Sequence, residues 1–319
     1  MKIKLGIIMD PICSINIKKD SSFPILIEAK KRGYLIYYME LLDLYLKNDK
    51  PFSKTKLLFV KKDEKKWFNF KKSNDISLLH LDVILMRKDP PVNEHYIYAT
   101  YILEQAEKQG VLIINKPKSL RNFNEKLFTI LFPQFIPNTL VTSDMFKIFN
   151  FIEKHKDVII KPLNGMGGLS IFRIKKNDPN TMVIIETMTN HGKQLCISQT
   201  YLPDIKYGDK RILIINGSPF PWCLARFPKI NENRGNIAAG GLGKVQKLTL
   251  YDWDIANSIS SILKDQELHF VGLDVIGNKL TEINITSPTC IQEIEAGCKT
   301  SISNIILNSI EKRLIKNRS

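Results

Sequence analysis

Cysteine is sparse in this chain and forms no recognisable framework. The 319 residues include five histidines and five cysteines, the latter at positions 13, 196, 223, 290 and 298. An odd number of cysteines without CxxC spacing argues against a disulfide-stapled scaffold, and neither residue type has the spacing of a zinc site. The pattern therefore predicts reduced thiols and a cytoplasmic location.

Long apolar runs are also missing. No stretch approaches the roughly 20 apolar residues of a membrane-spanning helix. The apolar start of the chain is interrupted at Asp10 and Pro11, before a signal peptide could form. We expect neither a membrane span nor a secretion signal.

Arginine is the third scarcity. The net charge of +15 comes from 47 basic and 32 acidic residues, but only nine of the basic residues are arginines. Recognition of bases and phosphates in nucleic acids relies on the bidentate guanidinium group, which lysine lacks. Ten lysines lie between Lys47 and Lys72, so we interpret much of the surplus as a solvated surface and expect no nucleic-acid partner.

The length is that of about two domains, and the first of them alternates strands with helices. Apolar runs predict strands over 4–10, 34–39, 82–87 and 111–115. Helices are predicted between them, over 22–33 and 95–109, each ended by a glycine. Strands separated by helices pair in parallel, so residues 1–122 are expected to form an open parallel α/β domain.

Residues 123–319 have a different, α+β pattern. Helices are predicted over 124–132, 144–155 and 179–190. Two further helices are predicted from apolar stripes, one formed by Trp253, Ala256, Ile259 and Leu263, and one at the C-terminus formed by Ile302, Ile306, Ile310 and Leu314. The predicted strands are 139–142, 158–163, 170–174, 196–202, 209–217 and a hairpin over 270–287. We divide this region into a central subdomain, 123–202, and a C-terminal subdomain, 203–319. Its Gly- and Asn-rich segment 227–243 is long enough to predict a mobile lid.

The strongest chemical pattern lies on the predicted strand LTEINITS. Glu282 and Asn284 are two residues apart and share a strand face, and oxygen donors of this kind suit Mg²⁺ held together with phosphates. Asp274 would join them if a three-residue loop, 277–279, paired it with Glu282, whereas a two-residue turn would place it on the wrong face. We predict the three-residue loop. A solvated strand face without metal is the alternative.

A second pattern joins Lys161 to the glycine-rich turn that follows it. Gly165, Gly167 and Gly168 lie between two predicted strands, so the segment is neither a Walker A loop nor a dinucleotide fingerprint. Backbone N–H groups of such a turn can still surround a phosphate, and a lysine on the preceding strand can reach the same charge. A plain hairpin turn is the alternative.

Three of the few arginines have informative positions. Arg211 begins a predicted strand, Arg226 ends another, and Arg234 lies in the predicted lid. Guanidinium groups on rigid backbone can hold a carboxylate or a transferring phosphoryl group, and one on a lid can close over it. Each could equally be a surface or structural arginine.

The order of these features resembles the plan of ATP-grasp ligases. Within that superfamily, several strings are similar to bacterial glutathione synthetases, from the first strand to the final helix. They are MRKDPP, INKPKSLRNFNEKL, KPLNGMGG, GDKRILI, GLDVIG and LTEINITSPTCIQEIE. The resemblance implies an ATP-grasp fold and the ligation of γ-glutamylcysteine to glycine with ATP, through an acyl phosphate, giving glutathione, ADP and phosphate.

The resemblance also implies roles for individual residues. Lys126 and Lys161 would hold the α- and β-phosphates beneath the loop formed by Gly165, Met166, Gly167 and Gly168. The adenine would lie against a hinge formed by Gln199, Thr200, Tyr201 and Leu202, with Asp209 as a nearby nucleotide contact. Two Mg²⁺ ions, with Mn²⁺ as a substitute, would be held by Asp274, Glu282 and Asn284.

Catalysis would rest on arginines. The resemblance makes Arg211 and Arg226 the groups that stabilise the transferred phosphoryl group and the substrate carboxylate, with Arg234 on the closing lid. It also implies a homotetramer. The alternatives are an ATP-grasp ligase for other amino acids or peptides, such as a D-alanine or glutamate ligase, and a non-catalytic ATP-binding protein of the same fold, such as a synapsin.

Overall fold

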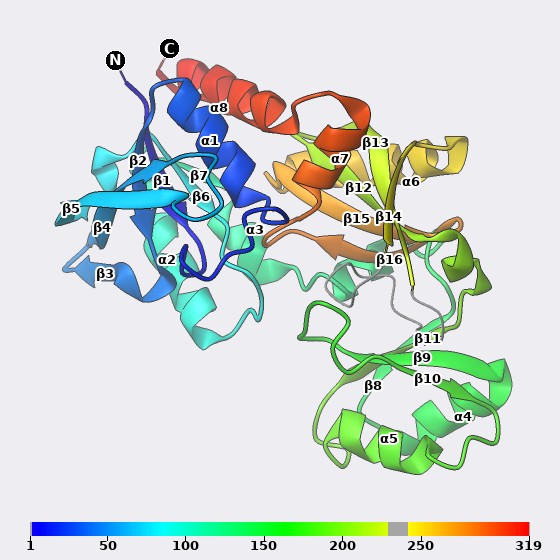
Figure 1. The fold of residues 1–319 in the computed structure, drawn as a ribbon. Helices are drawn as coiled ribbons and strands as arrows, with labels where there is room; N and C mark the ends of the chain where they lie inside the picture. The colour runs from blue at the N-terminus through cyan, green and yellow to red at the C-terminus, as the bar shows by residue number, and fades with distance from the viewer. Residues whose placement is uncertain (1, 229–241, 319) are drawn as a thin grey trace.

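The computed structural model describes residues 2–228 and 242–318, which form three sheets. Figure 1 shows the first sheet beside the third, while the second forms a separate lobe with its own helices. None of the described helices has both the length and the apolar composition needed to cross a membrane.

The first sheet is built around buried parallel strands. β1 (Lys4–Ile8), β2 (Leu35–Met39), β6 (Val83–Met86) and β7 (Leu112–Ile114) pair in parallel. Helices α1 (Ser22–Lys31) and α2 (Glu94–Lys108) connect them. Strands flanked by helices on both sides are buried on both faces, which explains the unbroken apolar runs. The predicted parallel pairing of these four strands is confirmed.

The lysine-rich segment contains three strands that the sequence pattern did not predict. β3 (Leu44–Lys47), β4 (Lys50–Val60) and β5 (Phe68–Ser77) extend the sheet in antiparallel fashion beyond β2. Short 3₁₀ turns, η1 (Leu41–Asp43) and η2 (Leu78–His80), flank them. The sheet is therefore mixed, with seven strands among the described residues.

The predicted helix over 124–132 is wrong. The chain forms helix α3 (Pro117–Asn122), breaks, and continues as the 3₁₀ helix η3 (Leu127–Leu131). The Asn124 side chain accepts hydrogen bonds from the backbone N–H groups of Lys126 and Leu127, at 3.1 Å each. The carbonyl of Glu125 accepts one from the backbone N–H of Ile283. The local side-chain bonds of Asn124 and this tertiary bond prevail over helix propensity.

The second sheet forms the separate lobe. Its strands, β8 (Thr139–Thr142), β9 (Asp157–Pro162), β10 (Phe172–Lys175) and β11 (Cys196–Thr200), are antiparallel in the order β10-β9-β11-β8. Helices α4 (Met145–His155) and α5 (Thr181–Thr189) cover it. A small core that includes Ile148, Ile160 and Ile185 holds the lobe together.

The third sheet is antiparallel in the order β14-β13-β12-β15-β16. Its strands are β12 (Asp209–Ile215), β13 (Ser218–Phe227), β14 (Leu242–Lys247), β15 (Phe270–Ile276) and β16 (Lys279–Asn284). The 3₁₀ helix η4 (Pro203–Tyr207) leads into it from β11, and α6 (Leu250–Asp265) and α7 (Ile291–Cys298) pack on it.

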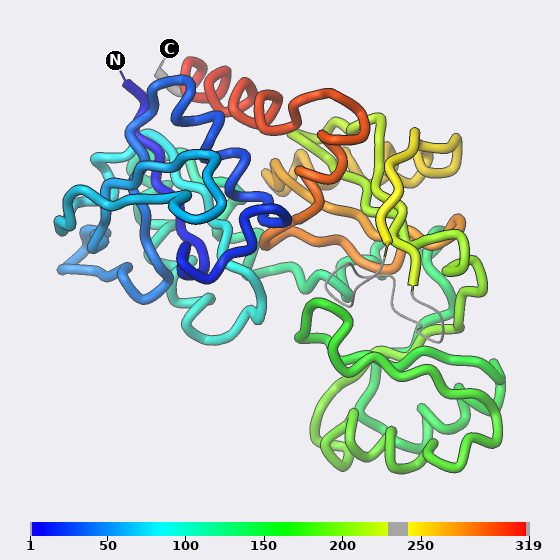
Figure 2. The backbone as a smooth tube through the Cα atoms, viewed as in Figure 1, coloured from blue at the N-terminus to red at the C-terminus, as the bar shows by residue number. Residues whose placement is uncertain are grey.

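The final helix, α8 (Ile302–Arg318), runs back from the third sheet to the first, so that both ends of the chain lie together (Figure 2). Its predicted stripe is buried in a core shared with α1 and β1; the stripe comprises Ile302, Ile306, Ile310 and Leu314. The stripe prediction is therefore confirmed.

Asn115 joins the first and third sheets. Its side-chain amide donates to the carbonyls of Phe270 (2.8 Å) and Ile285 (2.7 Å). Its oxygen accepts from the backbone N–H groups of His269 (2.7 Å) and Phe270 (2.9 Å). All of these bonds are buried, so one side chain satisfies four backbone groups at the junction.

Candidate active site

Asp274 and Glu282 face each other at the end of the third sheet. β15 and β16 pair antiparallel, with Asp274 opposite Glu282 and Gly272 opposite Asn284. The predicted pairing of Asp274 with Glu282 is confirmed. Directly opposed residues lie on the same face of a sheet, so the two carboxylates approach each other.

The predicted three-residue loop is wrong, although the pairing it was meant to produce is present. Ile276 pairs with Lys279 across a two-residue turn, and the register then shifts between Asp274 and Val275. The extra residue is Thr281, a β-bulge that places two residues of β16 opposite one of β15. The Thr281 hydroxyl donates to the carbonyl of Asp274 at 3.1 Å. Without the bulge, the two-residue turn would pair Asp274 with Thr281. The bulge shifts the register by one residue, so that Asp274 pairs with Glu282.

Two buried arginines hold Asp274. Arg211, on β12, donates through Nε at 2.6 Å and Nη2 at 3.1 Å, and Arg226, on β13, lies 3.0 Å from the same carboxylate. Burial opposes ionisation of Asp274, but the two guanidinium groups outweigh it and hold the pKa of this carboxyl below its ordinary value.

Asp209 completes this cluster on the neighbouring strand. Burial raises its pKa to about 6, although Arg226 donates a hydrogen bond to its Oδ2 and opposes the shift. Its Oδ1 is buried without a hydrogen-bond partner among the described residues. A buried acceptor of this kind is costly, and a donor on a bound ligand could satisfy it.

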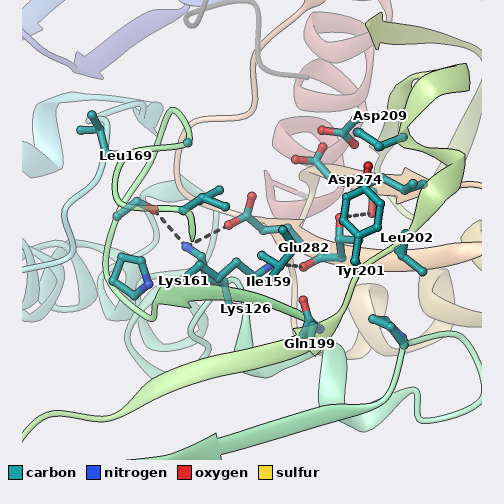
Figure 3. Close-up of a pocket in the computed structure, with 18 of the residues that line it drawn as sticks. Lys126, Ile159, Lys161, Leu169, Gln199, Tyr201, Leu202, Asp209, Asp274 and Glu282 are labelled. Atoms are coloured by element: carbon teal, nitrogen blue, oxygen red, sulfur yellow. Dashed lines mark hydrogen bonds and ion pairs between the residues drawn. The ribbon is translucent and has the colours of Figure 1, made fainter. Parts of the chain in front are cut away.

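Two buried lysines approach the carboxylates from other elements. Lys126 Nζ lies 3.1 Å from Glu282 Oε1 and donates to the carbonyl of Gly165 at 3.0 Å (Figure 3). Lys161, on β9, donates to the carbonyl of Thr281 at 3.3 Å. Burial lowers the pKa of Lys161, Glu282 opposes this shift and the Lys126 charge reinforces it. An anionic ligand between the lysines would be stabilised by both.

The glycine-rich turn joins β9 to β10, which pair as the predicted hairpin. Gly167 and Gly168 have φ values of +66° and +79°, a conformation that other residues rarely adopt. The turn lies over the lysines, because Gly165 accepts from Lys126.

A cavity between the second and third sheets collects most of the predicted residues. Figure 3 shows Lys126, Lys161, Glu282 and Asp274 along it, with Leu169 towards one end and Tyr201 and Leu202 towards the other. All of the predicted nucleotide contacts line it: Lys126, Lys161, Gly165, Met166, Gly167, Gly168, Gln199, Thr200, Tyr201, Leu202 and Asp209. Apolar residues such as Ile159, Ile171 and Ile276 complete the lining, a combination that suits a planar apolar ring carrying an anionic tail.

A second cavity adjoins the first. Its lining includes Arg211, Arg226 and Asn284, together with residues from the end of β6 and from the segment after β16, namely Asp89, Pro90, Thr286, Ser287, Thr289 and Cys290. The two cavities share a wall made of Gly165, Met166, Gly167, Asp274 and Glu282. The carboxylate pair therefore lies where the contents of the two cavities would meet.

The side-chain oxygens of Asp274 and Glu282 in the shared wall, and of Asn284 beside it, suit the coordination of a hard divalent cation. The Asn284 side chain donates to the carbonyl of Gly272 at 3.2 Å, which leaves its amide oxygen available as a ligand. Among the described residues no group of three or more His, Cys, Asp and Glu could hold a metal alone. Two carboxylates and an amide oxygen nevertheless suit Mg²⁺, which keeps water and takes phosphate oxygens as its remaining ligands.

Arg234 and most of the predicted lid, 229–241, lie outside the described residues. The segment joins the end of β13 to the start of β14, which are neighbouring antiparallel strands. Arg226 lies next to this connection, at 3% exposure.

Sequence reasoning missed Glu125. Its Oε1 accepts hydrogen bonds from the backbone N–H groups of Ile285 (2.8 Å) and Thr286 (3.0 Å) and from the Thr286 hydroxyl (2.9 Å). It thereby fixes the chain just after Asn284. Burial raises the pKa of Glu125, and the nearby Glu282 adds to the shift. Its position directly before Lys126 was the only signal in the sequence.

Two family models match consecutive parts of the chain. The family model described as "Prokaryotic glutathione synthetase, N-terminal domain" matches residues 3–121, and "Prokaryotic glutathione synthetase, ATP-grasp domain" matches residues 125–299. A protein of Buchnera aphidicola subsp. Baizongia pistaciae named glutathione synthetase is 65% identical over 320 residues, covering 100% of this chain and 99% of its own length. Its namesake in Escherichia coli strain K12 is 57% identical, covering 98% and 99%.

Solved structures show the same fold at much lower identity. D-cycloserine synthetase DcsG matches with a TM-score of 0.67 and 10% identity, covering 98% of this chain and 99% of its own. The ATP-grasp ligase PsnB, complexed with minimal precursor, Mg and ADP, has a TM-score of 0.62 and 12% identity, covering 97% and 98%. The fold is thus ATP-grasp, and the full-length matches show that the chain belongs to the prokaryotic glutathione synthetase family.

Proposed function

We propose that the two adjoining cavities divide the substrates of an ATP-dependent ligase that forms glutathione. ATP would occupy the first cavity, and γ-glutamylcysteine and glycine the second. The shared wall carries this proposal, because phosphoryl transfer requires the γ-phosphate and the accepting carboxylate to meet in line. Family membership supports the choice of substrates, and the lining residues support the division.

The nucleotide would be held at both ends. Lys126 and Lys161 would contact its phosphates, and the turn Gly165–Gly168 would cover them with backbone N–H groups. The adenine would lie against the segment from Gln199 to Leu202. Asp209 Oδ1, which has no partner among the described residues, would accept a hydrogen bond from the nucleotide.

We assign Mg²⁺ binding to Asp274, Glu282 and Asn284, with Mn²⁺ as a substitute. When bound, the metal would neutralise charge on the β- and γ-phosphates. The chain itself would orient the reactants: Arg211 and Arg226 would hold the substrate carboxylate and the transferred phosphoryl group in the second cavity.

In this scheme the cysteinyl carboxylate of the dipeptide attacks the γ-phosphate, and ADP leaves. The glycine amine then attacks the activated carbonyl, and phosphate leaves. An acyl phosphate is lost if water reaches it first, so the segment 227–243, with Arg234, would close over the site during turnover.

Phosphate release from ATP tests the proposal. We expect release with γ-glutamylcysteine and glycine together, and at most one equivalent per site when glycine is omitted. Steady release with other amines in place of glycine, and none with glycine, would instead favour a ligase for another acceptor. An absence of release with every amine, despite ATP binding, would favour a non-catalytic nucleotide-binding protein.

The Glu282→Gln variant tests the carboxylate pair. It keeps the side-chain shape but removes one charge from the metal set and from the ion pair with Lys126. We therefore expect phosphate release to fall at least about 100-fold while the chain stays folded at the assay temperature. The matched control is Glu153→Gln, whose carboxylate pairs with Lys176 on the surface at 2.8 Å. Full activity in the Glu282 variant would refute the metal assignment.

The division of the chain follows from the same scheme. We propose residues 1–122 as the N-terminal domain and residues 123–319 as the ATP-grasp domain, with subdomains at 123–202 and 203–319. The three separate sheets support this division. We also propose that the protein acts in the cytoplasm as a homotetramer, which analytical ultracentrifugation of the purified chain would test.

A further inference from the structure

Tyr201 stands where the chain leaves the second sheet for the third. It follows the last residue of β11, and η4 begins two residues later. Together with Leu202 it lines one end of the first cavity (Figure 3). This segment therefore belongs both to the cavity lining and to the connection between the two sheets.

The ring of Tyr201 is covered by a guanidinium group from outside the cavity lining. The Cζ atom of Arg173, on β10, lies 3.4 Å from the ring centroid. Arg173 also makes a bidentate pair with Asp157, through Nε at 2.9 Å and Nη2 at 2.6 Å. A planar guanidinium can stack on an aromatic face and bind a carboxylate in its own plane at the same time.

Asp157 closes the arrangement. Its backbone carbonyl accepts a hydrogen bond from the Tyr201 N–H at 2.9 Å, while its side chain holds Arg173. The three residues therefore form a ring of contacts: backbone to backbone, ring to guanidinium, and guanidinium to carboxylate. Asp157 begins β9, the strand that carries Lys161, so the ring ties the hinge to the phosphate-binding strand.

We propose that Arg173 is a positioning residue that fixes the Tyr201 segment for nucleotide binding. The inference rests on the assignment of the first cavity to the nucleotide. Arg173 acts through Tyr201, since it does not line the cavity itself. Its loss would leave the backbone bond to Asp157 as the one polar contact of Tyr201 within residues 2–228 and 242–318. The nucleotide would then have to order the hinge on binding.

The test measures binding of Mg·ADP by calorimetry and steady-state kinetics in the full chain. We expect Arg173→Met to weaken ADP binding by roughly fivefold to tenfold, the size of one partly buried cation–π contact. The KM for ATP should rise in parallel, while kcat at saturating ATP and the KM for γ-glutamylcysteine should stay within about twofold. Arg173→Lys keeps the charge but loses the planar guanidinium group, so its ADP affinity should lie between those of Arg173→Met and the wild type.

Arg32→Met provides the matched control. Arg32 is about as shielded as Arg173 and pairs with Glu28 (3.1 Å) and Glu311 (3.0 Å), but it joins α1 to α8 and lines none of the described cavities. We expect it to lower the melting temperature without changing ADP affinity. Equal loss of ADP affinity in both variants would show a general effect of stability and overturn the proposal.

A double-mutant cycle tests whether Arg173 acts through Tyr201. Adding Arg173→Met to Tyr201→Leu should weaken ADP binding by less than about twofold, because the stack is already absent. Fully multiplicative effects, or unchanged ADP affinity in Arg173→Met, would overturn the proposal. ADP binding requires no ligase activity, so a wild-type chain that binds ADP but releases no phosphate would refute the proposed ligation alone.

Discussion

At the scale of single residues, the active-site wall depends on charges that are buried together. Asp274 remains ionised because two arginines surround it, whereas Asp209 and Glu125 are raised in pKa by burial. The alternation of cations and anions keeps each group close to a partner. Removal of one member would leave its neighbour buried and unpaired, which costs more than the contact itself contributes.

His269 gives a pH dependence of stability that is separate from catalysis. Burial lowers its pKa to about 4, and the nearby positive charges of Arg313 and Lys116 add to the shift. The unfolded chain binds this proton at about pH 6.5, so the stabilisation is complete above that pH and is lost as the pH falls towards 4. At most about 3 kcal/mol is involved.

Urea unfolding at pH 7.5 and pH 5 checks this prediction. The wild type should lose stability between the two, and His269→Gln should lose clearly less. The exposed residue His95 supplies the control, since His95→Gln should lose as much unfolding free energy between the two pH values as the wild type does. An equal loss of stability between pH 7.5 and pH 5 in His269→Gln and in the wild type would contradict the role given to His269.

At the scale of elements, patterns predicted the longer helices and the buried strands, but not the short helices α3 and α7, the break before η3 or the lysine-rich strands. The inward face of β4 carries Ser53 and Thr55, which are 0% and 2% exposed, so burial there does not appear as apolar alternation. The bulge at Thr281 was equally invisible, because one extra residue in a strand leaves no mark in composition. In the site, repeated glycines and a strand of oxygen donors were detectable. Single polar residues such as Glu125 and Arg173 were not, because their partners lie far away in the sequence.

The lysine-rich strands lead to a prediction about charge. Lys62, Lys66 and Lys72 are exposed and line neither of the two cavities of the candidate active site. Replacing all three by glutamine should change kcat/KM by less than about twofold, because salt screens the interactions of exposed charges that do not contact the site. Phosphate release at low and physiological ionic strength checks this. A large loss that depends on salt would show that the lysines attract the anionic substrates.

At the scale of the whole molecule, Asn115 adds a buried polar contact to the apolar cores that the first and third sheets share. Asn115→Ala would leave four buried backbone groups without partners, and we expect it to cost about 3 kcal/mol or more in the free energy of unfolding. Urea unfolding followed by fluorescence measures this loss. Asn69→Ala, at an exposed position on β5, should be nearly neutral. A single transition of unchanged midpoint in the Asn115 variant would contradict its role.

The shared wall has a consequence for how ligands affect one another. Gly165, Met166, Gly167, Asp274 and Glu282 line both cavities. In the proposed division of the substrates, each ligand would therefore form part of the other's surroundings. Binding free energies linked in this way are reciprocal: whatever factor the nucleotide contributes to the affinity for the dipeptide, the dipeptide returns to the nucleotide. If the substrates are divided as proposed, they would be each other's effectors, and the affinity of either would have a defined value only when the occupancy of the other is stated.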